Sequence, residues 1–171
     1  MFKKILCPVD FSDTSMDAAN NAIKFASEIK AEITFIHVID IQTLQNIADL
    51  SGGGINDLDL LVEEEKPVLS KLKDEAEKKG IKVNTVLTHG EPVNIVLNEI
   101  KEGGFDLIVM GTHGKKGLTR LVLGSMAESI VRQSQIPVLL YHCTGEKCWS
   151  LNNYVKYLQI FKHPIIYNNK K

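Results

Sequence analysis

The sequence predicts an α/β protein: a single-domain, open five-stranded parallel sheet in the order 3-2-1-4-5, with helices on both faces. Short apolar runs rich in β-branched residues alternate along the chain with segments that repeat apolar residues at helical spacing. Such alternation favours parallel pairing with right-handed crossovers, which place helices over both faces of the sheet. The length of 171 residues is enough to bury one core of this kind.

The expected strands are short apolar runs, each followed directly by a polar residue or a glycine. In the first run Ile5, Leu6 and Val9 form the apolar body, and Asp10 follows it. The second run is rich in β-branched and aromatic residues, a composition typical of strands. The runs span residues 3–9, 31–39, 81–88, 105–110 and 136–141.

The segments between these runs are the expected helices. Residues 11–14 offer several N-cap candidates for the first helix, and Pro92 suits the first turn of the third. Pro67 falls inside the second helix, where we expect a kink or a fresh start. Gly80 and Gly103–Gly104 are natural ends for the second and third helices. The last helix is expected from Gly124–Ser125 to about residue 134.

A glycine-rich stretch, Met110-Gly111-Thr112-His113-Gly114, follows the fourth strand, and Gly124–Ser125 opens the last helix. Glycines let a backbone expose its N–H groups, and a helix N-terminus favours negative charge, so together they form an anion cradle. Taken alone, the stretch is more often a pair of tight turns around a surface loop. Another glycine-rich segment, Ser51–Gly54, lies in the long connection after the second strand and is interpreted as flexible linker.

The predicted strand order brings two segments to one switch point, where ligands bind in sheets of this kind: Asp10 follows strand 1 and Gly111 follows strand 4. A nucleotide would fit, with phosphates on the N–H groups of Gly111, Gly114 and Ser125. The Asp10 carboxylate could accept a ribose hydroxyl, and the main chain of Val38 could read an adenine edge. Two alternatives stay open, since Asp10 could simply cap the first helix and Val38 could simply be core.

The pattern Gly111-x2-Gly114-x9-Gly124-Ser125 resembles the nucleotide-binding pattern of the universal stress protein (UspA-like) family. The strand ends Ile5–Asp10 and His37–Asp40, and the segment Ser134–Leu140, are also similar to that family. The resemblance covers residues 1–142 as a universal stress protein domain and leaves residues 143–171 as a C-terminal extension. It implies the ATP-binding branch of the family and an adenine nucleotide alpha hydrolase-like fold.

The resemblance implies ATP as the cofactor. Magnesium or manganese could accompany its phosphates, although neither a protein ligand set for a metal nor a catalytic residue is visible in the sequence. The implied binding residues are those around the two strand ends and the start of the last helix. They are Pro8, Val9, Asp10, Val38, Met110, Gly111, Thr112, His113, Gly114, Gly124, Ser125, Met126 and Ala127.

The function expected from these residues is regulatory: a homodimer whose nucleotide state modulates stress-response interactions with a protein partner that the sequence does not identify. One alternative is a slow ATP hydrolase, for which Asp13 and His113 are the nearby candidates to orient water. Another is an interaction module that binds no nucleotide. The resemblance implies that the dimer forms through the fifth strand, Val138 to Tyr141, whose apolar edge would otherwise promote aggregation.

Composition excludes several classes of function. A net charge of -1 argues against a nucleic-acid partner and gives no reason to expect an acidic membrane partner. No apolar stretch approaches the ~18 residues of a membrane span, and none suits a signal peptide, so we expect a cytoplasmic protein. Cys7 is expected as a buried thiol in the first strand, and Cys143 and Cys148 as free thiols.

The C-terminal extension, residues 143–171, has no counterpart in the family pattern. We expect a short amphipathic helix capped by Ser150, followed by a loose tail, and we expect the helix to pack near the fifth strand. The apolar positions of this helix are Leu151, Tyr154, Val155, Leu158 and Phe161.

Overall fold

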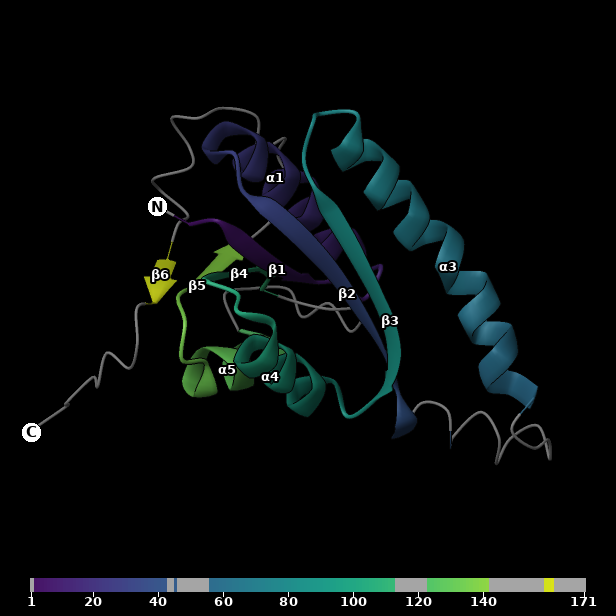
Figure 1. Ribbon diagram of the computed structural model, residues 1–171. Helices are drawn as coiled ribbons and strands as arrows, with labels where there is room; N and C mark the ends of the chain where they lie inside the picture. The colour runs from purple at the N-terminus through teal and green to yellow at the C-terminus, as the bar shows by residue number, and fades with distance from the viewer. Residues whose placement is uncertain (1, 43–44, 46–55, 113–122, 142–158, 162–171) are drawn as a thin grey trace, which may run out of the picture.

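A computed structural model of the chain describes residues 2–42, 45, 56–112, 123–141 and 159–161 (Figure 1). The strands and helices alternate along the chain as the sequence predicts. In order they are β1 (Lys4–Pro8), α1 (Asp13–Ile29), β2 (Glu32–Asp40), α3 (Asn56–Glu77), β3 (Val83–Gly90), α4 (Pro92–Gly103), β4 (Leu107–Gly111), α5 (Ser125–Gln133), β5 (Val138–Tyr141) and β6 (Gln159–Phe161).

The sheet has six strands in the order β3-β2-β1-β4-β5-β6, and its first five are parallel. The predicted parallel order 3-2-1-4-5 is therefore confirmed. At its centre β1 pairs with β2 on one side, where Cys7 is in register with Phe35, and with β4 on the other. This central position brings the carboxyl end of β1 beside those of β2 and β4.

One part of the C-terminal extension differs from the expected helix. Gln159–Phe161 is a strand, β6, which pairs antiparallel with β5, where Leu139 is in register with Ile160. The helical assignment is wrong at these residues because the edge of β5 offers N–H and C=O groups that an extended segment satisfies. The expected position near the fifth strand is correct for this segment. The remainder of the extension, residues 143–158 and 162–171, lies outside the described residues, as does residue 142.

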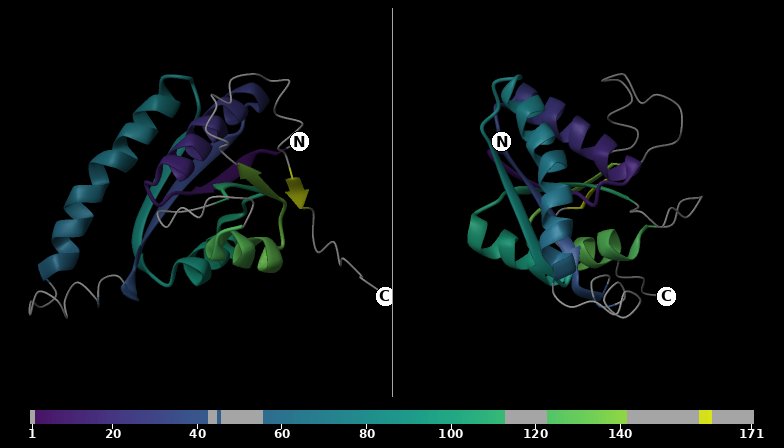
Figure 2. Two further views of the ribbon diagram at one scale, coloured as in Figure 1. Left: turned by 180° about the vertical axis from the view of Figure 1, so that it is seen from behind. Right: turned by 90° about the vertical axis from the view of Figure 1, so that its right-hand side faces the viewer.

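Helices cover both faces of the sheet, α1 and α3 on one and α4 and α5 on the other (Figures 1 and 2). Each face has its own core. Ile23 of α1 and Leu72 of α3 are buried with Phe35, whereas Val96 of α4 and Ile130 of α5 are buried on the opposite face. The side chains of a strand therefore alternate between two fully packed layers, as expected for a parallel sheet.

Several helix ends are set by short-range interactions that the sequence predicts. The N-cap of α1 is Ser12, whose side chain accepts a hydrogen bond from the main chain of Ser15. The N-cap of α4 is Glu91, and this helix ends at Gly104 in the left-handed conformation, φ 64°. At Pro67 the expectation of a fresh helix start is wrong, because α3 continues through it as one helix. Leu72, beyond the proline, anchors the helix in the core.

Within the described part of the chain, no helix combines the length and the apolar character needed to cross a bilayer. The predicted linker Ser51–Gly54 falls outside the described residues, as do His113 and Gly114 of the glycine-rich stretch.

Candidate functional site

The switch point of the sheet lies between β1 and β4. After β1 the chain enters α1 on one face, whereas after β4 it continues to α5 on the other face (Figure 2). Adjacent connections that leave in opposite directions create a crevice at the carboxyl ends of the strands. Of the predicted site residues, Asp10 lies two positions beyond β1 and Thr112 directly follows β4.

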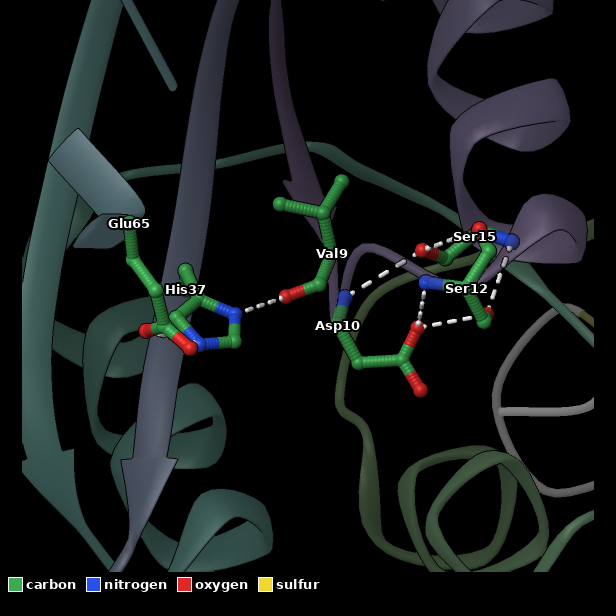
Figure 3. A network of polar contacts seen from close by, with 6 residues as sticks. All are labelled: Val9, Asp10, Ser12, Ser15, His37 and Glu65. Atoms are coloured by element: carbon green, nitrogen blue, oxygen red, sulfur yellow. Dashed lines mark hydrogen bonds and ion pairs between the residues drawn. The ribbon is translucent and has the colours of Figure 1, made fainter. Parts of the chain in front are cut away.

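The turn from β1 into α1 orients Asp10 through its own hydrogen bonds (Figure 3). The carboxylate Oδ1 accepts from Ser12 N at 3.1 Å and from Ser12 Oγ at 2.6 Å. The main-chain N–H of Asp10 donates to Ser15 Oγ at 3.2 Å. Because the N-cap of α1 is Ser12, the alternative in which Asp10 caps this helix is not what the structure shows. The turn instead holds a carboxylate at the carboxyl end of β1.

A buried histidine lies on the other side of this turn. His37 of β2 is 4% exposed, and its Nδ1 lies 2.6 Å from the carbonyl oxygen of Val9. Its Nε2 lies 2.8 Å from Oε2 of Glu65 on α3. Phe11 stacks on the imidazole with ring centroids 4.3 Å apart, and it has the left-handed φ of 60° that is uncommon outside glycine. Three elements therefore meet at one ring (Figure 3).

Sequence reasoning missed this cluster. A histidine in an apolar strand was the signal, because a polar ring on the core face needs hydrogen-bond partners. Nothing in the sequence pairs it with Glu65, which stands in a run of three glutamates on the second predicted helix. Glu65 Oε2 accepts no well-aligned hydrogen bond from the described residues, so its contact with His37 is electrostatic.

Val38 has a side chain in the core and main-chain groups near the end of its strand. Its side chain is half-buried and packs against the core over α4 and α5, so the alternative of a core role is correct for the side chain. Ile36 O accepts from Val9 N at 2.9 Å. Because main-chain groups alternate in direction along a strand, those of Val38 point to the same side as those of Ile36, beyond the end of β1.

The other side of the switch point is held together by main-chain hydrogen bonds. Thr112 N donates to Tyr141 O at 2.9 Å, and Gly124 N donates to Thr112 O at 2.7 Å. The second bond joins the end of β4 directly to the start of α5. Gly124 is the N-cap of α5, and no side chain of the described residues caps this helix. The exposed Ser125 is its first residue, and the N–H groups of the first turn have no partner within the helix.

The remaining predicted site residues of the described part of the chain lie in the core or at strand ends. Met110 and Ala127 are buried in the core at 4% and 3% exposure, and Met126 packs against the same core. Pro8 and Gly111 are the last residues of β1 and β4. The described members of the predicted set therefore lie at the ends of β1, β2 and β4 and at the start of α5. His113 and Gly114 lie outside the described residues.

The site contains no conventional metal centre in the described part of the chain, where no three His, Cys, Asp or Glu side chains gather. Burial raises the pKa of the Cys7 thiol, so this side chain stays protonated and acts as a core residue.

Asp13, a candidate to orient water in the alternative of a slow ATP hydrolase, is an exposed residue in the first turn of α1. Its charge there complements the helix dipole.

Comparison with known proteins gives a consistent result. The sequence model of the universal stress protein family matches residues 1–142. The universal stress protein MJ0531 of Methanocaldococcus jannaschii is 40% identical over 141 residues, 82% of this chain and 82% of that protein. The structure of MJ0577, a universal stress protein of the same organism, is 33% identical with a TM-score of 0.73, covering 84% of this chain and 97% of that one.

A more distant structure shares the fold alone. A universal stress protein family member from Arabidopsis thaliana, solved with AMP bound, is 14% identical with a TM-score of 0.56, covering 86% of this chain and 97% of that one. The family model and the relative at 40% identity carry the assignment. This chain belongs to the universal stress protein family.

Proposed function

We propose that this chain binds ATP at the switch point and acts as a cytoplasmic regulatory protein whose nucleotide state modulates its interactions in the stress response. One observation carries the proposal: an oriented carboxylate lies at the end of β1, and a helix start that no described side chain caps is bonded to the end of β4, both at the carboxyl edge of the sheet. A carboxylate accepts hydrogen bonds from ribose hydroxyls, and a helix N-terminus favours phosphate.

The described residues fit the two ends of a nucleotide. Asp10 and the main chain of Val38 suit the ribose and the base, and the first N–H groups of α5 suit the phosphates. The Arabidopsis relative of the same fold was solved with AMP bound. We propose ATP rather than AMP from the glycine pattern that ends at Ser125, and a magnesium or manganese ion would then be held through the phosphates.

The proposal includes a homodimer through Val138 to Tyr141. The edge of β5 pairs with β6 in the structure. A second copy that pairs through Val138 to Tyr141 therefore displaces β6 from this edge.

A charge placed at the start of α5 tests the phosphate site. Ser125→Glu puts a carboxylate on an exposed first-turn position, where it suits the helix dipole and leaves folding intact. The same carboxylate repels phosphates. We expect ATP affinity, measured by isothermal titration calorimetry with magnesium present, to fall at least about tenfold.

Gln133→Glu is the matched control. It makes the same charge change on an exposed residue at the opposite end of α5, so ATP affinity should stay within about twofold of wild type. Equal ATP affinities in all three proteins would refute the site. Mass spectrometry of nucleotide released from the purified wild type addresses turnover, because ATP indicates a sensor and ADP indicates hydrolysis.

A further inference from the structure

The His37–Glu65 contact requires a proton. A carbonyl oxygen can only accept, so His37 Nδ1 must carry the hydrogen that it directs at Val9 O, 2.6 Å away. A neutral ring of this tautomer presents a lone pair at Nε2, which lies 2.8 Å from the carboxylate oxygen of Glu65. Two acceptors at that distance repel each other. One proton must therefore lie on Nε2 or on Glu65 for the contact to form.

The surroundings leave Glu65 as the charged partner of this ring. Phe11 covers one face of the imidazole. The Asp10 carboxylate is directed away, toward Ser12 (Figure 3). On β3 the register partner of His37 is Leu87, and His89 follows one step further along the same face as an exposed residue. On β1 the nearest ladder residues, Cys7 and Pro8, are uncharged at neutral pH.

The charged residues of the neighbouring helices are directed to solvent or paired elsewhere. On α3, Lys66 forms an exposed ion pair with Glu63, and Glu64 is exposed. On α1, Asp13 is exposed. Among the described residues, Glu65 is thus the titratable group that contacts His37.

The contact also fastens one end of α3. From Asp59 onward, the residues of α3 that are buried in the core are Leu69, Leu72 and Ala76, and these follow Pro67. Between Asp59 and Lys66 the helix carries exposed or half-buried side chains, including Leu60 at 64% exposure. Among the described residues, the pair of His37 and Glu65 is therefore a polar contact that ties this first part of α3 to the strand ends.

We propose that His37 and Glu65 form a proton-dependent clasp that positions the nucleoside half of the nucleotide site; this inference rests on the proposed function. The proton removes the repulsion between Nε2 and Glu65, so the imidazole stays between Glu65 and Val9 O. Asp10 follows Val9 in the chain and Val38 follows His37, so the clasp sets the spacing of both predicted nucleoside contacts. Loss of the proton separates Glu65 from the ring and loosens that spacing. Both are positioning residues, and affinity for the nucleoside falls as the pH rises.

Adenosine is the probe of this effect, because it lacks phosphates and so reports on the nucleoside half alone. We expect the adenosine affinity of the wild type to be at least about fivefold lower at about pH 9 than at about pH 6. Glu65→Gln removes the need for the proton, since its amide N–H can donate to a neutral Nε2. Its adenosine affinity should be high and nearly independent of pH.

Glu64→Gln is the matched control, because it makes the same change at the adjacent exposed residue and should keep the wild-type pH profile. A fall in Glu65→Gln equal to that in wild type would overturn the clasp, as would a flat profile in wild type. Nitrogen chemical shifts of His37 give a readout without ligand, and the clasp predicts a protonation step that Glu65→Gln alters. Absence of adenosine binding at every pH, with that step present, would instead refute the proposed function.

Discussion

The two halves of the candidate site are stabilised by different kinds of interaction. The nucleoside half lies at the ends of β1 and β2, and the phosphate half lies at the end of β4 and the start of α5. At the ends of β1 and β2, side-chain interactions fix the structure: Asp10 is oriented by Ser12, and His37 lies between Val9 and Glu65. At the end of β4 and the start of α5, a main-chain hydrogen bond from Gly124 N to Thr112 O fixes the structure instead. The first half orients single side chains, whereas the second presents a row of N–H groups.

This difference predicts that the two halves are sensitive to different amino-acid substitutions. A half built by buried side chains depends on particular residues, because removing one partner leaves another polar group unsatisfied. A half built by main chain tolerates most side-chain changes on its exposed positions and is sensitive to charge near its N–H groups. The two halves should therefore respond to different ligands and different substitutions.

The largest expected effect follows from removing the carboxylate of the nucleoside half. Asp10→Ala should weaken adenosine and ATP binding by about 10- to 100-fold, since hydrogen bonds to a charged group contribute about 1.5–3 kcal/mol. Tripolyphosphate, which lacks the nucleoside, should bind as it does to wild type. Titration calorimetry with the three ligands measures this.

Ser125→Glu should have the opposite effect: it should weaken the binding of tripolyphosphate and ATP and leave the affinity for adenosine unchanged. The pair of variants thus separates the halves by ligand. If Asp10→Ala weakened tripolyphosphate as much as adenosine, the turn would act on the whole crevice and the division into halves would fail.

The same contrast explains what sequence reasoning could reach. The main-chain half leaves a local signature, because positions that expose N–H groups favour glycine, and Gly111, Gly114 and Gly124 stand at a recognisable spacing. Apolar runs and helical periodicity likewise predict the strands, and crossover handedness limits the orders in which they can pair. The clasp of His37 and Glu65 leaves no such signature, since it is a tertiary contact between side chains far apart in the sequence.

The error at β6 has a related cause. Phe161 lies at helical spacing from the apolar residues before it, so periodicity predicts a helix. Periodicity describes a segment by itself, whereas the edge of β5 offers Gln159–Phe161 a ladder of main-chain partners. Tertiary pairing overrides local pattern in a segment this short.

Substitutions in the two halves should also differ in their effect on the free energy of unfolding, although this effect is smaller. Ser12→Ala removes the N-cap of α1 and the hydroxyl that donates to Asp10, so it should lower the free energy of unfolding by about 1–2 kcal/mol. Ser125→Ala changes an exposed residue at the start of α5, where no described side chain caps the helix. It should cost no more than about 0.5 kcal/mol. Urea denaturation of both variants measures the difference, and equal costs would contradict the contrast.

The smallest expected effect on binding comes from a change in β6, which pairs with β5. β5 supports the phosphate half through Tyr141 O, which accepts from Thr112 N. Ile160→Pro removes a main-chain donor from β6 and disfavours its pairing with β5. Because β5 keeps its parallel ladder with β4, tripolyphosphate affinity should change by less than about threefold and adenosine affinity should stay as in wild type.

Freeing the edge of β5 should, however, increase self-association, since an unpaired apolar edge is a template for a second copy. Sedimentation velocity over a range of protein concentrations measures this, with Asn169→Pro as a control farther along the extension. An increase in the first variant alone supports a dimer through Val138 to Tyr141 that β6 competes with. A decrease would mean that β6 itself builds the dimer. No change would place the dimer on another surface, and β6 would then be an edge cover for the strand that supports the phosphate half.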